Sequence, residues 1–310
     1  MTAAPLGLGR GDLSAMCRSA ADVAAAGQRR TKLLVRCELI ALVGAAAAGV
    51  HGLHFGSSKL DGLAAVAGIL FLVSLGCLTF RSITTPENTW YAGRAGAESV
   101  RTLAWRYSIG GDPFPTTLTE KDAADLYLDR LTRILKELAD LELAPAAPDD
   151  RELTPAMKRV RAASFADRRA VYLRDRIENQ IRWYTGKSEQ HAKAARFWLS
   201  AAALASGAGV IAAGLRLFSV VDVDLLGVAA GCASAAIAWN QLNQNRMLVA
   251  AYRVTARELV IIRDRAENVD EQHWPAFVSD AEDAVSREHT LWLARHGHPG
   301  LAAGSRSGNA

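Results

Sequence analysis

Two runs of this chain place aromatic and charged side chains on one face of a predicted helix. The first run carries Trp90, Arg94, Glu98, Arg101 and Trp105. At 100° per residue these positions share an arc of about 80°. The second run repeats the same type of spacing, at Tyr172, Arg176, Gln180, Trp183 and Lys187. Arginine beside an aromatic ring has the chemistry to stack on a base or to hold a phosphate.

These two faces have alternative interpretations. Glu98 can pair with Arg94 and Arg101 at helical spacing, so the face can pack on a neighbouring helix or subunit with its charges satisfied. The sharper alternative is a ligand groove lined by tryptophan and arginine. No Gly-rich phosphate loop follows a predicted strand, and no strand pattern occurs. Packing or assembly is therefore the preferred prediction.

The histidines and cysteines form no catalytic or metal-binding pattern. His51 and His54 stand one turn apart near the end of an apolar stretch, where an interfacial position explains them better than a proton relay. The other histidines have no metal or triad context: His191, His273, His289, His296 and His298. The cysteines lack metal-ligand spacing, and we expect reduced thiols at Cys17, Cys37, Cys77 and Cys232. We predict that the chain is not an enzyme and holds no metal or cofactor.

The elements that must position these side chains include four apolar stretches without a charged residue. They cover residues 39–55, 63–80, 197–215 and 225–239, and a short loop joins each pair. An uncharged stretch of about 18 residues is typical of a helix that crosses a bilayer. The fourth is short and needs the polar residues up to 242 to span. A soluble helical bundle is the alternative, but its buried helices would usually keep a polar stripe.

The sequence therefore predicts an all-α membrane protein with two transmembrane helical hairpins, which make four spans, and long cytoplasmic helices. Basic residues flank the spans on one side, at Arg29, Arg30, Lys32, Arg36, Arg81, Lys193, Arg196 and Arg246. The loops carry only Lys59 and Arg216, with Asp222 and Asp224 in the second. By the positive-inside rule, both termini lie in the cytoplasm and the chain is a multi-pass protein of the inner (plasma) membrane.

Charge and composition agree with a bilayer partner. The chain is 50% hydrophobic and 22% charged, with a mean hydropathy of +0.06, as expected for apolar spans mixed with polar flanks. The net charge is +4 and the pI is about 9.0. Because its basic residues are scattered among acids, cations that flank the membrane explain this balance better than nucleic-acid binding. We expect no nucleic-acid partner and no cleavable signal peptide.

Small residues at intervals of four occur in three of the spans. The pairs are Ala64 with Gly68, Ala205 with Gly209, and Gly227 with Gly231. Such spacing lets helix backbones approach closely, so we predict that these faces pack in the membrane and that the protein is a homo-oligomer. The alternative is that alanine and glycine are simply frequent in this chain.

The chain is predicted to consist of two similar units. The first unit covers residues 1–145, a linker covers 146–164, the second unit covers 165–296, and the tail from 297 to 310 is expected to be disordered. Glu98 follows the second span at a distance similar to that of Glu258 after the fourth. In between, Thr117 with Glu120 suggests a capping box, and Thr154 with Pro155 suggests a helix start. The leucines between them have coiled-coil spacing, at Leu128, Leu131, Leu135 and Leu138.

Three segments carry a resemblance to a known family. The run from Tyr172 to Lys187 before the second hairpin looks like the SLATT family, the two-transmembrane effector domains associated with SMODS and SLOG proteins. The segments from Phe277 to Glu282 and from Glu288 to Arg295 are similar to the close of one SLATT subfamily. The segment from Trp90 to Tyr107 resembles the exit helix of another. The resemblance covers about residues 14 to 144 and 165 to 296.

This resemblance implies a membrane effector of a bacterial conflict or defence system that oligomerises into a pore and kills or arrests the cell. A nucleotide second messenger or a sensor protein is implied as a possible trigger by the enzymes and sensors encoded beside some relatives. A membrane-anchored helical scaffold or sensor that does not conduct is the alternative function.

Overall fold

The computed structural model describes residues 6–50, 61–220 and 225–295. Over these residues the chain is helical and contains no strand. The expected interfacial pair His51 and His54, the loop charges Lys59, Asp222 and Asp224, and the tail from 296 onward lie outside the described residues. The secondary structure is therefore all-α, as predicted.

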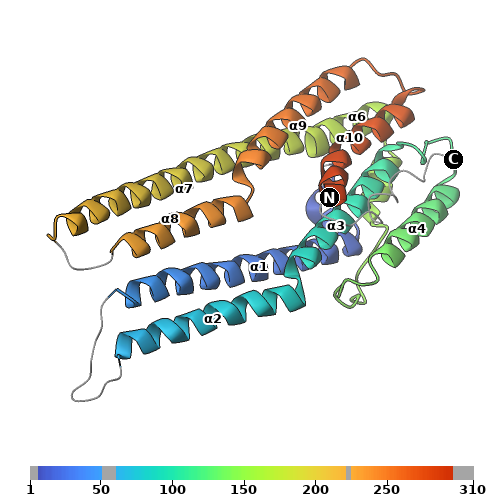
Figure 1. Cartoon of the computed structure of the whole chain (residues 1–310). Helices are drawn as coiled ribbons and strands as arrows, with labels where there is room; N and C mark the ends of the chain where they lie inside the picture. The colour runs from blue at the N-terminus through green and yellow to red at the C-terminus, as the bar shows by residue number, and fades with distance from the viewer. Residues whose placement is uncertain (1–5, 51–60, 221–224, 296–310) are drawn as a thin grey trace, which may run out of the picture. The chain divides into compact units, whose positions relative to one another are not determined.

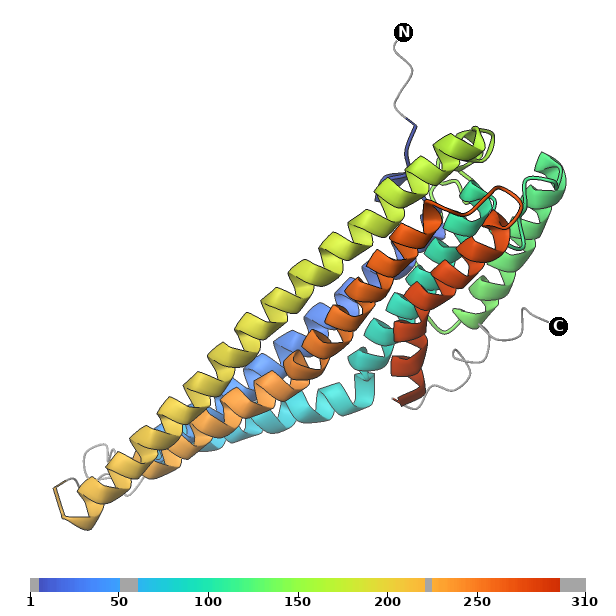
Figure 2. The same ribbon diagram turned by 90° about the horizontal axis from the view of Figure 1, so that it is seen from above.

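The helices are joined by connections of unequal length, the longest within the described residues being 138–154. In chain order they are a 3₁₀ turn Arg10–Asp12, α1 Ala15–Ala48, α2 Gly62–Thr84, α3 Pro86–Ile109, α4 Glu120–Glu137, α5 Pro155–Arg161, α6 Phe165–Val171, the π-helix Tyr172–Glu178, α7 Asn179–Leu217, α8 Leu225–Leu242, α9 Asn245–Ala266 and α10 Trp274–Arg295 (Figure 1). The run from α6 through the π-helix into α7 is continuous from Phe165 to Leu217, as Figure 2 shows in green to yellow.

The chain divides into two compact units that do not follow the order of the sequence. One unit, here called the helical body, contains residues 1–27, 87–186 and 251–310. The other, here called the hairpin unit, contains residues 28–86 and 187–250. Helices α1, α7 and α9 each contribute to both units. Both the body and the hairpin unit are therefore built from distant parts of the chain.

The hairpin unit contains the predicted spans. Helix α2 pairs with the second half of α1, and α8 pairs with the second half of α7 (Figure 1). Among the described residues, three helices are long and apolar enough to cross a membrane: Gly62–Thr84, Phe165–Leu217 and Leu225–Ala266. Helix α1 is not among them, because its described helical part ends at Ala48 and the expected first span runs on to residue 55.

Helix α3 begins because the chain turns sharply between it and α2. Thr85 adopts a left-handed conformation with φ of 37°, and its N–H donates to the carbonyl of Arg81. Pro86 then occupies the first helical position, where its fixed φ suits a helix and its missing N–H costs no hydrogen bond. This break separates the second expected span from the first aromatic and charged run.

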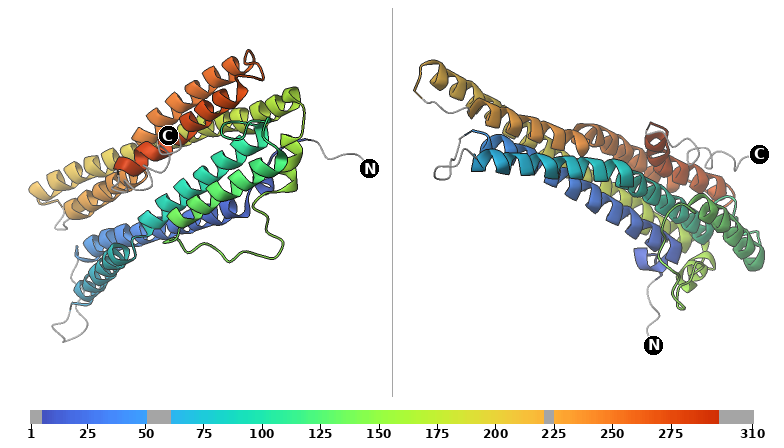
Figure 3. Two further views of the ribbon diagram at one scale, coloured as in Figure 1. Left: turned by 90° about the vertical axis from the view of Figure 1, so that its right-hand side faces the viewer. Right: turned by 60° about the horizontal axis from the view of Figure 1, so that its bottom comes forward.

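Helix α4 packs beside α3 in the helical body, as the left view of Figure 3 shows. Their contact includes Tyr107 and Tyr127, whose ring centroids are 5.2 Å apart. The N-cap of α4 is Thr119, which accepts from the N–H of Asp122, so the capping box expected at Thr117 was wrong by two residues. Of the predicted leucine stripe, Leu131 and Leu138 are buried, whereas Leu128 and Leu135 are exposed.

Helix α5 organises the loop that follows α3. The predicted start of α5 is confirmed, since Thr154 is the N-cap and its side chain accepts from the N–H of Met157. At the other end of α5, buried Arg161 donates to the carbonyls of Tyr107, Phe114 and Pro115 at 2.7–3.0 Å. One guanidinium thus satisfies three carbonyl groups that the end of α3 and the proline-rich loop leave free.

Candidate functional site: a buried ionic network in the helical body

Arg176 lies at the centre of a buried ionic network. It stands in the π-helix with only 2% of its surface exposed. Its Nε and one terminal nitrogen donate to the two carboxylate oxygens of Glu282, at 3.0 and 2.7 Å. The same terminal nitrogen donates to Glu98 at 2.9 Å. The guanidinium therefore joins α3, the π-helix and α10 by charge-assisted hydrogen bonds.

Three further side chains complete the network. Glu282 is fully buried, and it also accepts from the Tyr172 hydroxyl and from the Thr102 hydroxyl, both at 3.1 Å. Glu98 accepts from Arg101 at 2.5 Å. Two arginines thus face two carboxylates, so the group is electrically balanced. This balance matters because an uncompensated charge in such a site would be costly.

The protonation states follow from this geometry. Burial alone would lower the pKa of Arg176, but the charges of Glu282 and Glu98 outweigh it and hold that pKa well above its ordinary value. Burial, and next the charge of Glu282, raise the pKa of Tyr172 well above its ordinary value. Arg176 is therefore a permanent cation, and Tyr172 is a neutral hydrogen-bond donor.

A layer of aromatic rings covers the network. Tyr172 makes edge contacts with Trp105 and Trp274, with ring centroids 6.0 and 5.8 Å apart. Trp274 also contacts Phe165 at 5.5 Å and donates its indole N–H to the carbonyl of Ile109 at 3.0 Å. Trp105 and Trp274 are buried. Because the ionic groups lie beneath this layer, the network holds helices together and is closed to a ligand from solution.

The structure brings together only part of the predicted cytoplasmic interface. Glu98, Tyr172 and Arg176 are buried in the network, Trp105 is buried in the aromatic layer over it, and Arg101 lies at its half-buried edge. The other predicted residues are half-buried elsewhere: Trp90, Arg94, Gln180, Trp183 and Lys187. Trp90 stacks on its neighbour Tyr91, and Trp183 contacts Tyr184 and Tyr252. Lys187 donates to Gln190. Whether these five contact another subunit stays a prediction.

Sequence reasoning missed the partners of Arg176 on the other helices. Glu282, Thr102 and Trp274 were given no role, although Glu282 lies within the run that resembles the close of one SLATT subfamily. The symmetry expected between Glu98 and Glu258 does not extend to their surroundings, because Glu98 is buried and Glu258 is exposed. An acidic residue separated from Arg176 by 106 positions gives no local signal of its pairing.

The small residues predicted to pack in the membrane differ in whether another helix of the same chain lies beside them. A methyl group at Gly209 would lie 3.3 Å from the Cβ of Ala229, and one at Gly231 would lie 3.8 Å from the Cβ of Ala46. These two glycines therefore face helices of the same chain. Gly68 and Gly227 have open space at that position, Ala64 is exposed and Ala205 is half-buried. Packing of the outward residues against a second copy stays a prediction.

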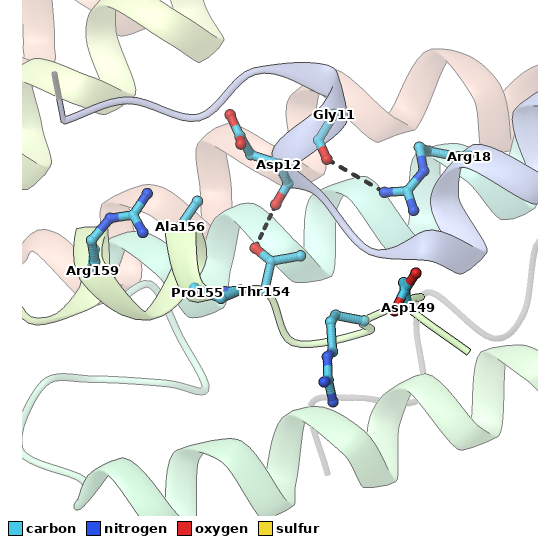
Figure 4. Close-up of a pocket in the computed structure, with 9 residues that line it drawn as sticks. Gly11, Asp12, Arg18, Asp149, Thr154, Pro155, Ala156 and Arg159 are labelled. Carbon is cyan, nitrogen blue, oxygen red and sulfur yellow. Dashed lines mark hydrogen bonds between the residues drawn. The ribbon is translucent and has the colours of Figure 1, made fainter. Parts of the chain in front are cut away.

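A polar cavity of about 310 Å³ lies in the helical body between the N-terminal segment and α5. It is lined by Asp12, Arg18, Asp149, Arg151 and Arg159, among others. Figure 4 shows the hydroxyl of Thr154 donating to the carbonyl of Asp12, and Arg18 donating to the carbonyl of Gly11. Since Arg18 also pairs with Asp150 at 3.1 Å, the cavity has mixed charge and specifies no single class of ligand.

The histidine and cysteine side chains of the described residues form no metal-binding cluster. No group of three histidine, cysteine or acidic side chains there could hold a metal ion. His191 contacts the amide oxygen of Asn245 at 2.7 Å, and His273 pairs with Asp270 on the surface. Both histidines therefore have a structural partner, and neither lies beside a nucleophile in these contacts.

Comparison with known families gives two adjacent matches. The model for the SMODS and SLOG-associating 2TM effector domain 3 matches residues 15–169, and the model for domain 1 of the same series matches residues 172–292. No curated protein and no solved structure matches the chain in these comparisons. The boundary between the matches falls beside Tyr172, so the ionic network joins Glu98 of the first matched region to Arg176 and Glu282 of the second.

Proposed function

From the premise that this chain belongs to the SMODS and SLOG-associating 2TM effector family, of which it carries two domains in tandem, we propose that it is a membrane effector of a bacterial conflict or defence system. In this proposal it resides in the inner membrane as a homo-oligomer. When triggered, it forms a pore or otherwise breaches that membrane. It acts by assembly and not by catalysis.

Exposed apolar side chains are the observation that supports membrane insertion most directly. Leu72 of α2 and Leu204 and Val210 of α7 expose 67%, 76% and 74% of their surfaces. Many exposed large apolar side chains on one set of helices indicate an interaction surface, and they are what a lipid-facing surface requires in a bilayer. We extend the candidate spans to four by including α1 from Leu39 onward, which places both termini and the helical body in the cytoplasm.

Conduction requires more than one subunit in this proposal. The predicted spans carry no charged side chain, so one chain does not offer a polar wall for water or ions. The open faces at Ala64, Gly68 and Gly227 would allow close approach of a second copy. Polar side chains and backbone groups would then have to face a central channel formed by several copies.

The trigger would act on the helical body. A nucleotide second messenger or a sensor protein is the proposed activator, in line with the association named in the family description. The closed ionic network would transmit the effect of the trigger through the helical body. While Arg176 stays paired, α3, the π-helix and α10 would have to move together.

A membrane-potential measurement tests the pore proposal. Cells that express the chain under activating conditions should lose the signal of a potential-sensitive dye, whereas an intact potential would contradict pore formation. Gly227→Ile should reduce the loss because it fills the predicted contact face. Gly207→Ile is the matched control, because Gly207 also has open space around it but lies outside the three predicted pairs.

The second candidate is a scaffold or sensor that does not conduct. The half-buried Trp90 and Trp183 favour it, because both are large aromatic side chains with surface left for a partner. This function predicts unchanged membrane permeability, while substitution of Trp90 or Trp183 dissolves the oligomer. Measuring the dye signal and the oligomer size on the same variants separates the two candidates.

A further inference from the structure

The hairpin unit carries a strong excess of positive charge at one end. Six exposed cations lie there, here called the cationic rim: Arg29, Arg30, Arg36, Lys193, Arg196 and Arg246. The acidic residues near them are Glu38 and Glu189, and Glu38 lies 3.7 Å from Arg81. In the described part of the hairpin unit, no carboxylate lies within ion-pair distance of a rim cation.

Ring contacts place Arg36 of the first hairpin beside an aromatic residue of the second. The guanidinium of Arg36 on α1 lies over the ring of Trp239 on α8, 4.8 Å from its centroid. Trp239 in turn contacts Trp198 on α7, with centroids 6.3 Å apart. Arg30 lies over the ring of Phe80 on α2, also at 4.8 Å. The aromatic rings that mark a membrane interface therefore lie beside the rim.

The position of Arg36 over the Trp239 ring leaves it suited to bind an anion. The ring face attracts the guanidinium cation but supplies no oxygen acceptor for its N–H groups. Those N–H groups match the paired oxygens of a phosphate. The ring also limits the number of conformations of the side chain, so less entropy is lost when the anion binds.

We propose that the cationic rim binds the phosphate groups of anionic phospholipids, and that a phosphate bound to Arg36 beside Trp239 holds the first hairpin against the second. This inference rests on the membrane insertion proposed above and adds the identity of the lipid. It also assigns a role to Arg36 and Trp239 that the family matches do not.

The neighbours of the rim favour a lipid over a soluble anion. Leu33, Ile40 and Phe197 lie within one helical turn of rim cations and expose 61%, 71% and 63% of their surfaces. Acyl chains would cover these side chains while the headgroup phosphate meets the guanidinium. A free phosphate or an acidic protein surface would satisfy only the charge. The combination of exposed cations and exposed apolar groups therefore selects an amphipathic anion.

Lipid retention by the purified full-length protein tests the proposal. The protein is exchanged into mixed micelles that contain equal amounts of dioleoylphosphatidylglycerol and dioleoylphosphatidylcholine, and the bound lipid is measured by native mass spectrometry. The wild type should retain the anionic lipid in excess. Each rim cation removed should weaken that preference about fivefold. Arg36→Gln should also reduce the rise in thermal midpoint that phosphatidylglycerol produces.

Two variants control for folding and for general charge. Arg36→Lys keeps the cation without the paired guanidinium N–H groups, so it should retain more anionic lipid than Arg36→Gln and less than the wild type. The double variant Arg253→Gln with Arg257→Gln removes two exposed cations from α9 in the helical body and should leave retention unchanged. Inorganic phosphate added to the protein in place of phosphatidylglycerol should not raise the thermal midpoint, and an equal rise would identify a soluble-anion site and overturn the lipid assignment.

The outcomes separate this inference from the proposed function. Equal retention of the two lipids by the wild type, or unchanged retention by Arg36→Gln, would overturn the cationic rim as a lipid site. Release of the wild type from membranes by alkaline carbonate would instead contradict membrane insertion itself. Protein that resists carbonate but shows no lipid preference leaves insertion intact and removes only the lipid proposal.

Discussion

At position 176 a single guanidinium satisfies two carboxylates that belong to different helices. Arg176→Met would leave Glu98 and Glu282 without their shared cation, while the methionine keeps much of the side-chain volume. We expect a loss of about 3–5 kcal/mol in the free energy of unfolding, because breaking a buried ion pair leaves an uncompensated charge. Unfolding of the purified protein by SDS, followed by tryptophan fluorescence, measures this loss.

The matched control is Arg182→Met, since Arg182 is 67% exposed and lies 4.0 Å from Glu178 on the surface. It should change the unfolding free energy by less than about 1 kcal/mol. Equal effects at positions 176 and 182 would show that the network adds nothing to stability. Glu282→Gln should cost more than Glu98→Gln, because Glu282 is fully buried and accepts from Arg176, Tyr172 and Thr102.

Cys17 offers a second prediction at the scale of a single side chain. Its thiol is buried and donates to the carbonyl of Ala97 at 3.4 Å. Burial raises the pKa of the Cys17 thiol, an effect that the charge of Arg101 only partly opposes. Because the thiolate is the reactive form, maleimide should label Cys17 slowly at pH 7 and at pH 8, and fast only after unfolding in SDS.

The measurement needs a variant in which Cys17 is the single cysteine, with Cys37, Cys77 and Cys232 replaced by alanine. Labelling is followed by mass spectrometry with and without SDS. Rapid labelling of the folded protein at pH 7 would mean that α1 and α3 separate readily around Ala97.

At the scale of the element, one glycine determines how closely α1 and α3 approach. A methyl group at Gly93 would lie 2.9 Å from the backbone nitrogen of Ala24 and 3.0 Å from the carbonyl oxygen of Ala20. Backbone atoms cannot move aside as a side chain can, so Gly93→Ala must push the two helices apart. We expect a cost of about 1–3 kcal/mol, as for other overpacked contacts.

Gly186→Ala on α7 is the natural comparison, since nothing lies within 4 Å of the added methyl group. It should stabilise the helix by about 0.5–1 kcal/mol through helix propensity. SDS unfolding of both variants shows whether each substitution lowers or raises the free energy of unfolding. A stabilising Gly93→Ala would mean that α1 and α3 are not in tight contact at this point.

The sequence predicted those helix boundaries that depend on residues within one turn, and it did not predict the features that depend on distant helices. Thr154 with Pro155 identified the start of α5, because a capping side chain and a proline act within one turn. The π-helix was not expected, and the spacing of Tyr172 and Arg176 was interpreted as a regular α-helix. A π-helical turn depends on tertiary contacts, and here two of its three buried residues, Tyr172 and Arg176, bind side chains of α10 and α3. Partners on distant helices have no signature in the local sequence.

At the scale of the whole molecule, three of the four apolar stretches predicted helices that are long and apolar enough to cross a membrane, because hydropathy over one helix is a local property. They did not predict that the chain folds into two units composed of interleaved segments. The division into units at 1–145 and 165–296 follows from the proline-containing linker between the two apolar hairpins, and it stays a prediction. The family matches meet at residues 169 and 172, and the helical body contains parts of both.

This interleaving leads to a prediction about the two halves of the chain. If residues 1–169 are expressed alone, Glu98 lacks its partner Arg176. If residues 170–310 are expressed alone, Arg176 keeps Glu282 but lacks Glu98. The aromatic layer would also be divided, because Trp105 lies in one half and Tyr172 and Trp274 lie in the other. Each half alone should therefore be degraded or aggregate in membranes, whereas co-expressed halves should copurify when only one carries an affinity tag.

Glu98→Gln in the first half should weaken copurification, because it removes the charge that pairs with Arg176 across the boundary. Glu87→Gln, at the half-buried start of α3, is the control within the same helix and should leave copurification intact. Stable, monodisperse halves that do not associate would show instead that the two SLATT domains fold independently and that the network forms only after they do.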